Sequence, residues 1–181
     1  VSAADVALIQ EHRIPDGDGP DRAAAAAKKD GWQFLPMPAL RTGTAVAATS
    51  AGVGVAARKG FGYRPSRVEV VPIEYAHRIS HAWVAAVVRG GVHSISCYLN
   101  HSEGLSAENL DLLDQLIAIT FTLKGPWLIG GDFNMPPHVL LASGFLQAIG
   151  GQPKRCQDLF AVPLLQRLAV SGFGCQPPAG G

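Results

Sequence analysis

The feature that most constrains this chain is an unbroken apolar run that ends in two glycines, an acid and two prolines. It lies at 127–137 and reads WLIGGDFNMPP. An apolar run that gives way to turn residues predicts a buried strand whose last residues enter a loop. If strand geometry persists to Asn134, Asp132 and Asn134 share one face while Phe133 faces the core. The sequence therefore predicts a carboxylate and a carboxamide side by side where a buried strand ends.

Two glycines precede that acid. Gly130 and Gly131 carry no Cβ, so another backbone, a metal cluster or a phosphate can approach closely at this point. We therefore expect close packing or ligand contact here.

Two other predicted strands also end at polar side chains. An apolar run over 5–12 turns polar at Glu11, which is typical of a buried strand with an exposed end. A β-hairpin is predicted over 78–89 and 92–99, because two runs rich in β-branched residues flank a Gly-Gly turn. Tyr98 lies where its second strand ends.

The best helix in the sequence is predicted over 106–124. Ser106 can cap it, and its core-facing stripe is predicted to be Leu110, Leu113, Ile117 and Phe121. Because this helix joins the hairpin to the 127–137 strand, it implies a strand–helix–strand unit. The remaining elements expected are helices over 21–31 and 138–149, strands over 32–40 and 52–58, and a strand or helix over 159–170.

Composition favours one domain spanning 1–181. With 181 residues and 48% apolar content, the chain is long enough for a single core. Its three cysteines are widely spaced, so they indicate neither a disulfide scaffold nor a zinc site and favour a reducing compartment. No apolar run approaches the roughly 18 residues of a membrane helix. We expect a soluble monomer without membrane association, intracellular and either nuclear or cytoplasmic.

A cationic segment at 58–67 is a candidate substrate contact. The net charge of +1 does not by itself indicate a nucleic-acid binder. This segment, however, holds four cations, two aromatic rings and no acid. Cations that pair with phosphates and rings that stack on bases suit a nucleic-acid groove, and a solvated connecting loop is the alternative. The four cations are Arg58, Lys59, Arg64 and Arg67.

The Gly-Asp-Phe-Asn tetrad at 131–134, after an apolar strand, resembles the signature of the endonuclease/exonuclease/phosphatase superfamily. These are metal-dependent phosphodiesterases that include DNase I-like, apurinic and retroelement (retrotransposon) endonucleases. The resemblance implies an α/β fold, a four-layer sandwich of two packed mixed sheets flanked by helices, here with some edge strands absent.

The same resemblance implies the site residues. Glu11, which follows a Gln at the end of an early strand, matches the ligand of the divalent metal, Mg²⁺ or Mn²⁺. Tyr98 matches a tyrosine that hydrogen-bonds the scissile phosphate, although Asn100 stands where the family often has a proline. Asp132 would accept a proton from the attacking water, and Asn134 would orient Asp132 or the phosphate. Tyr98 as a strand residue bonded to backbone is the alternative.

The implied function is hydrolysis of phosphodiesters in nucleic acid, with DNA the favoured substrate. A phosphatase or lipid phosphodiesterase of the same superfamily is one alternative. A fragment that binds nucleic acid or protein without turnover is another. The family's C-terminal Ser-Asp-His and its early Asn have no match, so we interpret the chain as truncated at both ends and leave its turnover open. His12 is expected to be structural, and no role is assigned to His101, His138 or Asp158.

Overall fold

The apolar runs of the sequence form the strands of two main sheets. The computed structural model describes residues 4–43, 48–66, 70–85, 89–101, 103–150, 152–155 and 167–174. The strands are β1 Val6–Ile9, β2 Trp32–Met37, β3 Leu40–Arg41, β4 Thr49–Ser50, β5 Val53–Arg58, β6 Tyr63–Pro65, β7 Ile79–Val84, β8 Val92–Tyr98, β9 Gly125–Asp132, β10 Gln152–Arg155 and β11 Arg167–Gly174. The helices are α1 Gly19–Lys29, α2 Ala107–Thr122, α3 Pro137–Ala142 and α4 Phe145–Ala148, with a 3₁₀ turn η1 at Ile73–Tyr75.

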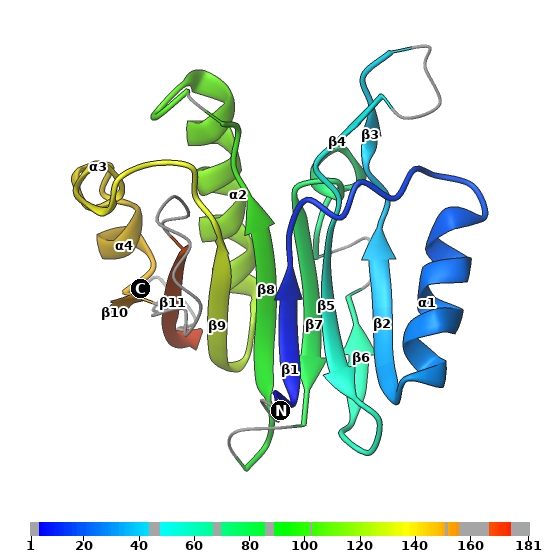
Figure 1. The fold of residues 1–181 in the computed structure, drawn as a ribbon. Helices are drawn as coiled ribbons and strands as arrows, with labels where there is room; N and C mark the ends of the chain where they lie inside the picture. The colour runs from blue at the N-terminus through cyan, green and yellow to red at the C-terminus, as the bar shows by residue number, and fades with distance from the viewer. Residues whose placement is uncertain are drawn as a thin grey trace.

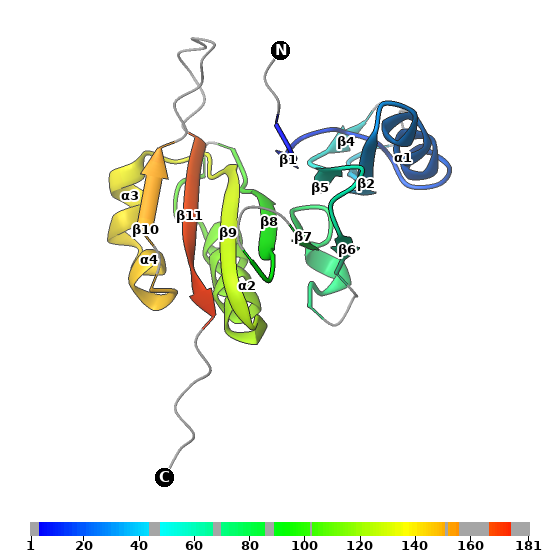
Figure 2. The same ribbon diagram turned by 90° about the horizontal axis from the view of Figure 1, so that it is seen from below.

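Two sheets pack face to face between layers of helix (Figures 1 and 2). One has the order β1-β5-β2 and the other β10-β11-β9-β8-β7-β6, while β3 and β4 form a small separate pair. Helix α1 packs on β2, and helices α2 to α4 cover the outer face of the larger sheet. The predicted four-layer α/β sandwich is therefore confirmed. The larger sheet is mixed because β8 and β9 are parallel, whereas the pairs of the three-stranded sheet are antiparallel.

The two faces of the larger sheet have different cores. Small apolar side chains fill the space between the sheets, where Val55 and Ala57 meet Ala82 and Val84. Larger side chains, such as Trp127 on β9, pack against the helices on the outer face. The small residues let the two sheets approach closely.

The predicted hairpin and the strand–helix–strand unit are both confirmed. Strands β7 and β8 pair antiparallel, and α2 returns the chain to β9 beside β8. Ser106 caps α2, since its side chain accepts a hydrogen bond from the Asn109 N–H at 3.3 Å.

The predicted core-facing stripe of α2 is wrong at both ends. Leu110 and Phe121 are 41% and 47% exposed, and the buried face instead contains Asn109, Leu112 and Leu116. The helix is apolar on several sides, so the pattern alone does not fix its rotation. The side-chain hydrogen bonds of Asn109 fix the rotation of the helix. The Asn109 Oδ1 accepts from the Asn100 N–H at 2.7 Å, and its Nδ2 donates to the Gly104 carbonyl at 2.8 Å.

The single helix predicted over 138–149 is in fact two short ones. The break falls at Gly144, whose φ of +78° lies in the left-handed region that glycine adopts without a steric penalty. The Ser143 hydroxyl accepts a hydrogen bond from the Phe145 N–H at 3.2 Å and starts α4. Of the element predicted over 159–170, only the part that belongs to β11 lies within the described residues.

On disulfides and membrane-spanning helices, the structure gives information for the described residues alone. Cys97 is buried and unpaired, while Cys156 and Cys175 lie outside the described ranges. In the part of the chain that the structure covers, no helix is both long and apolar enough to cross a membrane.

The two glycines before Asp132 are required by packing. A Cβ on Gly131 would lie 2.2 Å from the carbonyl oxygen of Cys97 on β8. A Cβ on Gly130 would lie 2.4 Å from Cδ1 of Leu8, on the opposing sheet. The close approach allowed by the missing side chains is therefore used by protein atoms, and it brings β1, β8 and β9 together.

We predict that Gly131→Ala lowers the free energy of unfolding by about 3 kcal/mol, because the new methyl group would overlap backbone that cannot move alone. Urea denaturation would measure the change. Gly43→Ala is the matched control, since its Cβ would make an ordinary 3.4 Å contact with Ala48. Equal stability of the two variants would contradict the packing role of Gly131.

Candidate active site

Three strands end at the same rim of the sandwich, and each delivers one of the predicted side chains. The C-terminal ends of β1, β8 and β9 point to one edge of the molecule (Figure 1). In the parallel register of β8 and β9, Tyr98 is the partner of Asp132. The Leu99 N–H also donates to the Asp132 carbonyl at 3.0 Å. The structure therefore places Tyr98 and Asp132 side by side.

Ser96 attaches the end of β1 to β8. Its hydroxyl donates to the Ile9 carbonyl at 2.8 Å and accepts from Nε2 of Gln10 at 2.8 Å. Gln10 therefore points toward the larger sheet. Since Glu11 comes next in the chain, these bonds deliver Glu11 to the rim that holds Tyr98.

The phenol of Tyr98 is surrounded by charge. Its ring packs on Ala51 and Val53. Burial is the largest cause that raises the Tyr98 pKa, and the carboxylates of Glu11 and Asp132 raise it further. The cation of Arg78 and a hydrogen bond with Asn134 act in the opposite direction. Both predicted acids thus lie within electrostatic reach of one hydroxyl, which keeps its proton and can donate it in a hydrogen bond.

A tight turn sets Asn134 beside Asp132. Strand geometry ends at Asp132, so the predicted alternation does not continue, and Asn134 has a φ of +49°. Oδ1 of Asp132 accepts a hydrogen bond from the Asn134 N–H at 3.0 Å, and Phe133 is fully buried as predicted. Carboxylate and carboxamide are therefore neighbours through a side-chain turn.

Glu11 lies at the exposed side of the rim in a strained loop. Glu11 and Arg13 have φ values of +53° and +55°, and their side chains form an ion pair with Arg13 Nε at 3.2 Å from Oε1. Bonds from the backbone to Ala51 and Gly52 hold the loop in this shape. Left-handed non-glycine residues are costly, and they tend to gather at functional sites.

His12, between them, has the structural role expected from the sequence. Its Nδ1 accepts a hydrogen bond from the Ile14 N–H at 3.0 Å, which leaves Nε2 to donate to the Val53 carbonyl at 3.3 Å. Burial lowers the pKa of His12. The imidazole is therefore committed to holding the loop.

Arg78 belongs to the site although the sequence analysis did not select it. Its guanidinium lies 5.1 Å from the ring centroid of Tyr98 and donates to the Tyr98 carbonyl at 3.5 Å. Burial lowers its pKa, while Tyr98, Glu103 and Glu11 oppose this effect. The observed register places it there: Ile79 pairs with Cys97, so the preceding Arg78 lies opposite Tyr98. A two-residue turn at Gly90-Gly91, as predicted from the sequence, would not have revealed this.

The predicted cationic segment lies elsewhere. Strand β5 runs away from the rim, so Arg58 and Lys59 come at the opposite end of the molecule (Figure 1). Arg58 stacks on Trp32 at 4.4 Å and Arg64 stacks on Trp83 at 4.7 Å. Arg67 falls outside the described residues. The structure does not bring Arg58, Lys59 or Arg64 to the candidate site, and the binding role of all four cations stays a prediction.

Comparison with protein families identifies the chain. The model of the Endonuclease/Exonuclease/phosphatase family matches residues 1–151. The chain belongs to this family. A search of curated proteins found no match.

Solved structures of this family share the fold at low sequence identity. D. rerio TDP2, complexed with single strand DNA product, is 15% identical with a TM-score of 0.59, covering 96% of this chain and 73% of its own. The human Nocturnin catalytic domain with bound sulfate anion is 14% identical with a TM-score of 0.61, covering 92% and 68%. ANGEL2, a 2',3'-cyclic phosphatase, is 17% identical with a TM-score of 0.55, covering 80% and 43%.

The rim offers oxygen ligands of the kind that hard divalent cations prefer. Among the described residues, no three His, Cys, Asp or Glu side chains are grouped to hold a metal ion. Mg²⁺, however, typically takes only one or two protein carboxylates and completes its shell with water and phosphate. The exposed carboxylate of Glu11, with Asp132 also near Tyr98, fits that requirement.

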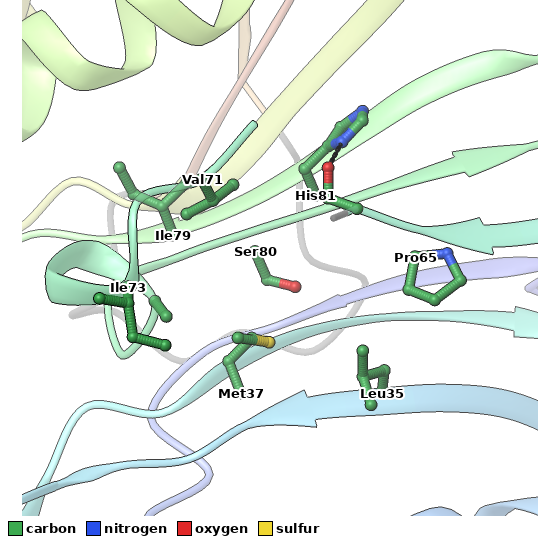
Figure 3. A pocket seen from close by; sticks show the side chains of 10 residues that line it. Leu35, Met37, Pro65, Val71, Ile73, Ile79, Ser80 and His81 are labelled. Atoms are coloured by element: carbon green, nitrogen blue, oxygen red, sulfur yellow. Dashed lines mark hydrogen bonds between the residues drawn. The ribbon is translucent and has the colours of Figure 1, made fainter. Parts of the chain in front are cut away.

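A separate small cavity opens between β2 and β7 (Figure 3). It measures about 170 Å³, is lined mainly by apolar side chains such as Met37, Ile73 and Ile79, and contains none of the predicted catalytic residues. His81 lies at one end of it. Its Nδ1 is bonded to the Ser66 hydroxyl, and its Nε2 lies 3.0 Å from Nδ1 of His93. Burial, and then the nearby His93, lower the pKa of His81 to about 4.

The lowered pKa of His81 predicts that the folded protein loses stability in acid. The unfolded chain binds a proton at His81 below its ordinary pKa of 6.5, whereas the folded chain resists protonation until about pH 4. Stability is therefore full above pH 6.5 and falls as pH decreases toward 4, by about 3 kcal/mol at most from this residue. Urea denaturation at a series of pH values would measure it. His81→Gln should lose less stability over the same interval, and equal slopes would contradict the assignment.

Proposed function

We propose that this chain is a divalent-metal-dependent phosphodiesterase acting on nucleic acid, an endonuclease of the apurinic or retroelement type with DNA as substrate. The observation that carries the proposal is the meeting of Glu11, Tyr98, Asp132 and Asn134 at one rim. Family membership and a fold shared with TDP2, solved with a DNA product, support it. The fold alone would not, because one fold serves many reactions.

The charges at the rim suit a phosphate that is being hydrolysed. Glu11 would hold the divalent ion, Mg²⁺ or Mn²⁺, which when bound neutralises charge on the phosphoryl oxygens. Tyr98 donates a hydrogen bond to a non-bridging oxygen, since its raised pKa keeps the hydroxyl protonated. Arg78 adds positive charge beside it and holds the ring of Tyr98 in place.

Asp132 is positioned to accept the proton of the attacking water. Its Oδ1 is fixed by the Asn134 N–H, which leaves the second oxygen to face the water. Asn134 in turn is anchored, because its Nδ2 donates to the Leu99 carbonyl at 2.7 Å. A general base fixed by an anchored partner needs little rearrangement in the transition state.

One observation favours a smaller substrate. The cations described near Tyr98 are Arg13 and Arg78, while Arg58 and Arg64 lie toward the far end of the strands. Two cations suffice for a single phosphate group. A phosphatase or lipid phosphodiesterase of the same family is therefore the second candidate, and a chain that binds without turnover is the third.

We predict that Asp132→Asn slows Mg²⁺-dependent nicking of supercoiled plasmid on the order of 10²- to 10⁴-fold, because the variant cannot accept the proton. Gel shifts in parallel should show DNA binding retained. EDTA should abolish nicking by the unaltered chain.

The controls separate the three candidates. Arg22→Ala should leave the nicking rate within about twofold, since Arg22 is exposed on α1 and pairs with Asp18. Hydrolysis of small phosphoesters without nicking would favour the second candidate, and DNA binding without any hydrolysis would favour the third. Nicking unchanged by Asp132→Asn would refute Asp132 as the base.

A further inference from the structure

We propose that His101 is the general acid of this site and protonates the leaving oxygen, an inference that rests on the proposed function. His101 follows β8, and its Nδ1 lies 3.1 Å from Oδ1 of Asn134. The residue is exposed, so a bound substrate can reach its ring. No motif in the sequence selected it, because its partner is 33 residues away in the chain.

The hydrogen bonds of Asn134 fix which nitrogen of the His101 ring carries a proton. Nδ2 of Asn134 donates to the Leu99 carbonyl at 2.7 Å, which turns Oδ1 toward His101. A carboxamide oxygen can only accept, so Nδ1 of His101 must carry a proton. Nε2 is then the nitrogen that gains and loses a proton, and it faces away from Asn134.

Asn134 lies between the proposed proton acceptor, Asp132, and the proposed proton donor, His101. Asn134 bonds Asp132 through its backbone N–H and His101 through its side chain. Hydrolysis of a phosphodiester needs a base near the attacking water and an acid near the departing oxygen, which lie on opposite sides of the phosphorus. Asn134 is the spacer that sets the distance between the two groups.

Hydrolysis by this route needs no reagent other than water. The water oxygen bonds to phosphorus as the bond from phosphorus to the leaving oxygen breaks, and the water proton passes to Asp132. The Nε2 proton of His101 passes to the leaving oxygen. His101 is left neutral with its Nδ1 proton still bonded to Asn134. Proton exchange with solvent restores both residues.

The test compares two leaving groups in the 181-residue chain with Mg²⁺. Plasmid DNA releases a poor leaving group that needs a proton, whereas thymidine 5'-(p-nitrophenyl) phosphate releases nitrophenolate, which does not. His101→Gln should slow nicking on the order of 10²-fold or more and nitrophenolate release by less than about tenfold. His138→Gln, an exposed histidine on α3, is the matched control and should leave both rates unchanged.

Equal losses on both substrates, or no loss on either, would overturn the role of His101. If the unaltered chain hydrolyses neither substrate, the proposed function fails by itself. A second measurement stands apart from turnover: long-range ¹H–¹⁵N correlation spectra should show the His101 ring as the Nδ1–H tautomer when neutral, and Asn134→Ala should abolish that preference. An Nε2–H ring in the unaltered chain would also refute the proposal.

Discussion

Two hydrogen bonds at Ser96 couple the sheets at the place where the site forms. Ser96 lies in the sandwich interior and bonds both the backbone of Ile9 and the side chain of Gln10. The other contacts of β1 with the larger sheet include apolar packing by Val6 and Leu8, and apolar packing is less directional than a hydrogen bond. Because Glu11 follows directly, these bonds, together with the backbone bonds from the loop to Ala51 and Gly52, set its distance from Tyr98.

The rim combines rigid supports with strained residues. Tyr98 and Asp132 end adjacent parallel strands, where Gly130 allows β9 to approach β1 and Gly131 allows it to approach β8. Glu11, Arg13 and Asn134, by contrast, occupy left-handed backbone conformations. Such strain persists only where surrounding structure overrides it, and a binding site gains from side chains that are already held in place. The cost in stability is therefore consistent with a role in binding phosphate.

The sequence predicted what depends on short-range pattern and missed what depends on three-dimensional direction. Strands that end at Tyr98 and Asp132 followed from apolar runs bounded by polar residues, whereas β1 is only half-buried and ends at Ile9, two residues before Glu11. The rotation of α2 could not be predicted from the apolar pattern, since both Leu110 and Leu112 could face the core. The buried Asn109 fixes the rotation that buries Leu112. The direction of β5 carried Arg58 away from the rim, which composition could not reveal. Arg78 was missed as well, because counting back from a two-residue turn at Gly90-Gly91 places Trp83 opposite Tyr98. The observed register pairs Val84 with Val92 and so places Arg78 there instead.

Paramagnetic broadening by Mn²⁺ in ¹⁵N-labelled chain tests most directly whether three distant segments form one metal and phosphate site. At low Mn²⁺, the amide signals of Glu11, Tyr98 and Asn134 should broaden together, and those of Arg58 and Arg64 should remain sharp. Broadening that spares one of the three rim segments, or that centres on the opposite end of the strands, would contradict a shared site.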